Sequence, residues 1–60
     1  MNKREIYMTL KKNHPRSASI EKNEYGLWEV VEVNGFEEEI FTYGVEKGKL
    51  RHITTLTMEL

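Results

Sequence analysis

Histidine and glutamate are the residue types in this chain with the most capacity for chemistry. His14 and His52 are its 2 histidines, it has no cysteine, and its 10 acidic residues are all glutamates. A zinc site built on a histidine pair needs short spacing, as in H-x-x-x-H or H-E-x-x-H, and these two histidines stand far apart. The sequence therefore predicts no metal site and no bound cofactor.

Catalysis by the remaining side chains also lacks a pattern. Ser17 and Ser19 lie outside any nucleophile-elbow sequence, and no aspartate is present. Paired glutamates act as acid and base only in a pocket that separates their pKa values, and a chain of 60 residues seldom forms one. We therefore expect a protein that is not an enzyme and has no small-molecule substrate.

The charges are segregated along the chain, which points to binding. Residues 23–46 hold seven glutamates and no basic residue, whereas residues 1–22 carry six basic and two acidic residues. Clustered carboxylates can bind a basic partner, or can simply neutralise basic neighbouring strands and prevent aggregation at an exposed hairpin end. The candidate partner-binding carboxylates are Glu37, Glu38 and Glu39.

A basic loop offers a function of a different class. The segment 11–16 is the most basic part of the chain, and an aromatic ring beside it would allow a single-stranded nucleic acid to bind by phosphate contact and base stacking. The net charge of −1 argues for a merely solvated loop instead. The candidate residues for this alternative are Lys11, Lys12, His14, Arg16 and Trp28.

The last eight residues favour pairing with another chain. The segment 53–60 is rich in threonine and branched apolar residues, has no proline and carries one charge, Glu59. Such strands pair readily with a second copy or with a partner strand, unless the strand is already paired on both sides. Ile53, Leu56 and Met58 are the candidate contact residues, and we expect a homodimer or higher oligomer or another protein partner.

A hairpin over residues 27–43 is the strongest structural prediction. Asn34-Gly35 separates two β-rich runs and is typical of tight hairpin turns. A two-residue loop sets Val33 opposite Phe36 and Glu32 opposite Glu37, whereas a three-residue loop pairs Glu32 with Phe36 and is favoured because it avoids the repulsion. In the favoured register Trp28 pairs with Ile40, Leu27 with Phe41 and Tyr25 with Tyr43.

Both faces of this hairpin carry apolar residues. We expect Trp28 and Val30 on one face and Leu27, Val31 and Phe41 on the other, so the hairpin should be covered on both sides or curled into a barrel.

The flanking segments are predicted with alternatives. Gly48 marks a second turn. The β-branched residues of the segment 50–58 favour a strand there, although the apolar residues of this segment also have a helical spacing. Alternation favours a strand over 6–10, against a helix from Lys3 to Lys12. Residues 17–22 are expected to form a short edge strand and 23–26 a turn.

Together these elements predict one small domain over residues 1–60. The expected fold is mostly β, a small antiparallel meander of four to five strands that can close into an SH3-like barrel, with an α+β fold carrying a short N-terminal or C-terminal helix as the alternative. No apolar run approaches the roughly 20 residues that a membrane helix needs, and we expect a cytoplasmic protein. The predicted function is a non-enzymatic protein-interaction or regulatory module acting through a sheet surface or an edge strand.

Overall fold

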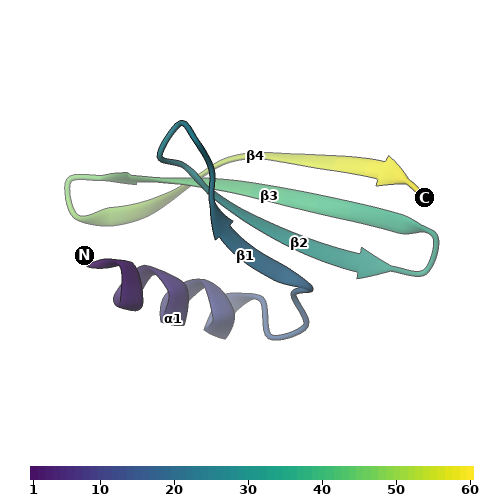
Figure 1. Ribbon diagram of the computed structural model, residues 1–60, viewed down its shortest axis with the longest axis horizontal. Coiled ribbons are helices and arrows are strands. Elements are labelled where there is room, and N and C mark those ends of the chain that lie inside the picture. Colours follow the sequence, from purple (N-terminus) through teal and green to yellow (C-terminus); the bar gives the residue numbers. More distant parts are fainter.

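One helix is followed by four strands that form a single antiparallel sheet. The computed structural model describes residues 1–60, and the strands lie in the order β1-β2-β3-β4, each beside its neighbours in sequence. Figure 1 shows the helix along one side of this sheet, which does not close into a barrel. The meander is confirmed, the SH3-like barrel is wrong, and the α+β alternative with an N-terminal helix is correct. The elements are α1 Lys3–Asn13, β1 Ser19–Lys22, β2 Trp28–Asn34, β3 Glu37–Glu46 and β4 Lys49–Glu59.

The N-terminal segment is a helix, so the strand predicted over 6–10 is wrong. Asn2 accepts a hydrogen bond from the Glu5 backbone N–H, and the Glu5 carboxylate accepts one from the Asn2 backbone N–H. This capping box satisfies backbone donors that a helix start leaves free. Ile6 and Leu10 stand one turn apart and are both buried. No helix of the chain is long and apolar enough to cross a bilayer.

The β2–β3 hairpin is confirmed, but both predicted registers are wrong. Asn34 pairs with Glu37, so Gly35 and Phe36 form the two-residue loop. Gly35 has a φ of 65° and Phe36 has a negative φ, as in a type II′ turn, where glycine takes the first central position. In this register two glutamates still repel each other across the hairpin, because Glu32 faces Glu39.

The register also corrects which residues share a face. Val30 pairs with Phe41 and Trp28 with Tyr43. Directly paired residues of an antiparallel ladder point to the same side, so Phe41 lies with Trp28 and Val30, not with Val31.

The second hairpin and the strand predicted over 50–58 are confirmed. Lys47 and Gly48 have φ angles of 52° and 75°, the two positive values that a type I′ turn requires. In the β3–β4 ladder Thr42 pairs with Thr54 and Tyr43 pairs with His52, which leaves one extra residue on β4. The extra residue, Ile53, forms a β-bulge that bends this strand.

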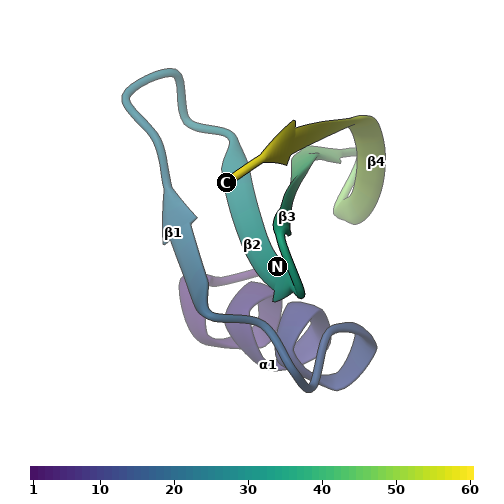
Figure 2. The same cartoon turned by 90° about the vertical axis from the view of Figure 1, so that its right-hand side faces the viewer.

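The core lies between α1 and one face of the sheet. Its buried apolar residues are Ile6, Leu10, Trp28 and Val30, of which Leu10 and Val30 are 0% exposed. Half-buried side chains from β1, β3 and β4 pack around them: Ile20, Phe41, Tyr43 and Leu50. Figure 2 shows α1 below the row of strands and no second helix on the other side. We call these the covered face and the open face of the sheet.

Candidate functional site: the open face and the β4 edge

Apolar side chains form a continuous row across the open face. Val31 pairs with Ile40, and Ile40 pairs with Leu56, so the three side chains lie side by side on β2, β3 and β4. Val31 and Ile40 are half-buried by one another, whereas Leu56 is 54% exposed. Val33 and Met58 extend the row, because each pairs with Glu38 from opposite sides.

Beside this row, β4 forms one edge of the sheet with no strand on its outer side. The Leu60 backbone N–H donates to the Phe36 carbonyl, which fixes which β4 residues face β3. Hydrogen-bonded pairs alternate along an antiparallel ladder, so the residues of β4 between them turn their backbone groups outward. The outward groups in the second half of β4 belong to Thr55, Thr57 and Glu59.

The three candidate glutamates do not form one surface. Glu38 pairs with Met58 on the open face, whereas Glu37 and Glu39 alternate onto the covered face. There Glu37 pairs with Glu59. The acidic cluster predicted from sequence is therefore divided between the two faces of the sheet.

The three apolar candidates, in contrast, lie together. Ile53, Leu56 and Met58 are all exposed residues of β4. A Cβ atom on Gly44 would lie 3.2 Å from Ile53 Cδ1 and 3.5 Å from Leu27 Cδ2, which places Ile53 and Leu27 over Gly44 on the open face. The bulge is the reason that Ile53 joins Leu56 and Met58 on this face.

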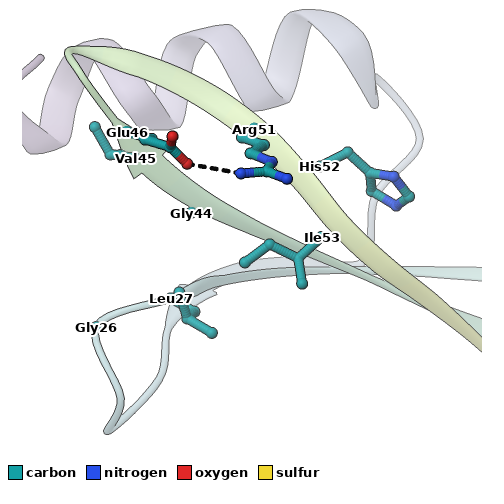
Figure 3. Close-up of a pocket in the computed structure, with 8 residues that line it drawn as sticks. All are labelled: Gly26, Leu27, Gly44, Val45, Glu46, Arg51, His52 and Ile53. Carbon is teal, nitrogen blue, oxygen red and sulfur yellow. Dashed lines mark hydrogen bonds and ion pairs between the residues drawn. The ribbon is translucent and has the colours of Figure 1, made fainter.

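A shallow depression lies where the open face meets the β3–β4 turn. Its volume is about 560 Å³. Figure 3 shows Leu27 and Ile53 pointing toward each other and Arg51 paired with Glu46 above them. The Arg51 Nη1 atom lies 2.8 Å from Glu46 Oε2, and both partners of this ion pair remain exposed. The residues that line it are Gly26, Leu27, Gly44, Val45, Glu46, Arg51, His52 and Ile53.

The covered face holds a partly buried polar cluster around His14. His14 Nδ1 lies 2.5 Å from Glu32 Oε2, and His14 Nε2 lies 2.7 Å from the Tyr43 hydroxyl. Burial, and to a smaller degree the charge of Glu32, raise the pKa of Tyr43 above its ordinary value of 10.0. Through these two contacts the cluster ties His14, the residue that follows α1, to β2 and β3.

The nucleic-acid candidates do not form one accessible surface either. Lys11, Lys12 and Arg16 are exposed at and after the end of α1, but Trp28 is 7% and His14 is 8% exposed. Base stacking needs an open aromatic face. Neither ring offers one here.

Sequence reasoning missed the two partners of His14 and the central residues of the open face. Glu32 and Tyr43 are distant from His14 in sequence, and no short motif joins them. Alternation along the strand places Val31 on this face, but Ile40 could be placed beside it only from the correct hairpin register.

The last question about the site is whether its side chains could bind a metal ion and whether known proteins resemble it. No group of three or more histidines and acidic side chains is arranged to hold a metal ion. No protein-family model, curated protein or solved structure matches this chain.

Proposed function

We propose that this chain is a non-enzymatic interaction module that binds a protein partner through the open face and the β4 edge. The observation that carries the proposal is the exposure of Ile53, Leu56 and Met58 directly beside an unpaired strand edge. Contiguous apolar residues rimmed by polar groups are typical of protein interfaces, and an unpaired edge offers backbone hydrogen bonds to an added strand.

Charge around the patch supports a partner that is a folded strand or surface and not a small molecule. Glu29 and Glu38 lie on the open face and are half-buried, and Arg51 is held by Glu46. Apolar contacts at the centre with charged residues at the rim are the ordinary arrangement of a protein interface.

The experiment compares capture of partners by three tagged forms of the full chain in its native host. Leu56→Lys places a charge in the centre of the open face, whereas Met8→Lys places the same charge on an exposed position of α1. We expect a protein, which can be the chain itself, to be recovered in stoichiometric amounts with the wild type and Met8→Lys but not with Leu56→Lys. If nothing that is recovered depends on Leu56, the proposed function is wrong.

A further inference from the structure

We infer that the partner at this site is a second copy of the chain, and that two β4 strands pair antiparallel about a two-fold axis beside Thr55. The inference rests on the proposed function and names its occupant. The two four-stranded sheets then join into one continuous sheet with both helices on the same side.

The two edges of the sheet differ in how they resist such pairing. Protein edge strands are usually kept apart by being short or by carrying charged side chains. β1 has 4 residues and ends in Glu21 and Lys22, so it has both protections. β4 has 11 residues, and the stretch from Ile53 to Met58 carries no charge. The dimer therefore exposes only β1 at its outer edges, and the assembly ends at two copies.

Charge complementarity selects a second copy in antiparallel orientation. β4 begins with Lys49 and Arg51 and ends with Glu59, which pairs with Glu37 of β3. Antiparallel self-pairing brings the basic start of one strand alongside the acidic end of the other. Parallel pairing would bring like charges together and is disfavoured.

The bulge at Ile53 fits a single register for this pairing. Glu46 and Lys49 close a two-residue loop and are hydrogen-bonded to each other, so Leu50 and His52 point their backbone groups outward before the bulge. Thr55, Thr57 and Glu59 do so after it. With Thr55 opposite its own copy, Thr57 meets His52 and Glu59 meets Leu50 once the extra residue is skipped. In this register the backbone N–H and C=O groups that point away from β3 in one copy face the same kind of groups in the other copy along the whole of β4.

The same register joins the two open faces. Leu56 lies opposite Thr54 of the second copy, and Met58 lies opposite Arg51 of that copy, diagonally across from the bulged Ile53. Both Leu56 and Met58 are exposed in the single chain and would be covered from the side that now faces water. This provides the additional apolar burial that a chain with four buried apolar residues lacks.

The first test measures mass against concentration by analytical ultracentrifugation. We expect a reversible monomer–dimer equilibrium for the wild type. Thr57→Lys places a charge next to β4 of the second copy. Thr55→Pro removes a backbone N–H that points away from β3, so it leaves the β3–β4 ladder intact. Each should raise the dissociation constant about tenfold or more, and Met8→Lys should leave it unchanged. Circular dichroism checks that each variant keeps its sheet.

The second test fixes the register with single cysteines, because the chain has none of its own. Thr55→Cys should form an intermolecular disulfide on mild oxidation, since paired Cα atoms in a ladder lie within disulfide range. Glu24→Cys, in the exposed β1–β2 turn, should not.

The outcomes separate the two proposals. A dimer that survives both Thr57→Lys and Thr55→Pro overturns pairing through β4. A strict monomer that still recovers a different protein in a Leu56-dependent way overturns the second copy as occupant but keeps the proposed function. Strict monomers with no Leu56-dependent partner overturn both.

Discussion

Val30 and Val33 lie on the same strand, yet Val30 is 0% exposed and Val33 is 51% exposed. They differ in the face that they occupy. The covered face is closed by Ile6 and Leu10 of α1, whereas the open face has equally apolar residues and no element above it. The difference shows that a single short helix, and not the apolar content of the strands, decides where this chain has its core. Four predictions test how far the two faces differ.

Leu10→Ala should have the largest effect on the free energy of unfolding. Leu10 is fully buried between α1 and the sheet, and truncating a leucine in such a site costs about 2–5 kcal/mol. A stability of about 0.05–0.15 kcal/mol per residue gives a domain of this size only a few kcal/mol, so the variant should be largely unfolded. Urea denaturation followed by circular dichroism measures this.

The matched control is Met8→Ala, two residues earlier on the exposed side of α1. It should change the free energy of unfolding by no more than about 0.5 kcal/mol. Equal losses for the two variants would show that α1 does not cover the sheet as described.

His14→Ala should have the next largest effect. It removes the partner of both the Glu32 carboxylate and the Tyr43 hydroxyl on the covered face. Leaving a fully buried group unsatisfied costs about 1–3 kcal/mol, and because Glu32 and Tyr43 are only half-buried we expect a loss of about 1 kcal/mol. His52→Ala, which removes an exposed histidine bonded to Thr55, is the control and should cost less. If His14→Ala cost no more than His52→Ala, the hydrogen bonds of His14 to Glu32 and Tyr43 would make no measurable contribution to stability.

The same cluster was beyond sequence reasoning, whereas the elements that carry it were partly predictable. Asn34-Gly35 correctly marked a turn, but both predicted registers would put a glutamate opposite Val30: Glu39 for the two-residue loop and Glu38 for the three-residue loop. The observed register puts Phe41 there. That choice depends on Val30 lying beneath α1, which the sequence of the hairpin does not contain.

The prediction of a strand in place of α1 has a related cause. Asn2 and Glu5 have the spacing of a capping box, which indicates the start of a helix. The alternation of Ile6, Met8 and Leu10 outweighed it, although Ile6 and Leu10 also satisfy the helical period. Once α1 is taken as a strand, no element is left to bury one face of the hairpin, and a barrel becomes the natural but incorrect conclusion.

Stability should also fall at alkaline pH because of Tyr43. Its pKa is raised in the folded chain, mainly by burial and further by Glu32, so the folded state keeps a proton that the unfolded state loses from about pH 10 upward. The contribution is complete below the unfolded pKa and is lost as the pH rises through the folded pKa. His14, His52 and Glu32 are the titratable groups that face the ring or hydroxyl.

Thermal unfolding measured across this pH range tests the effect. Tyr43→Phe should be less stable at neutral pH, because His14 loses a partner, but should show a smaller alkaline decline than the wild type. Tyr7→Phe, which changes an exposed tyrosine, should keep the full decline. An undiminished decline in Tyr43→Phe would assign the pH dependence to other groups.

Leu56→Ala should have the smallest effect on the isolated chain, which brings the comparison of the two faces back to function. Leu56 is mostly exposed, so at high dilution its truncation should change the free energy of unfolding by no more than about 0.5 kcal/mol.

At high concentration the wild type gains stability by mass action if it dimerises through this face, and the variant should lose that gain. Unfolding midpoints measured at two widely separated concentrations provide the test. A concentration-independent loss as large as that of Leu10→Ala would mean that the open face belongs to the core of the single chain, whereas a loss that appears only at high concentration marks it as a surface that is completed by a second molecule.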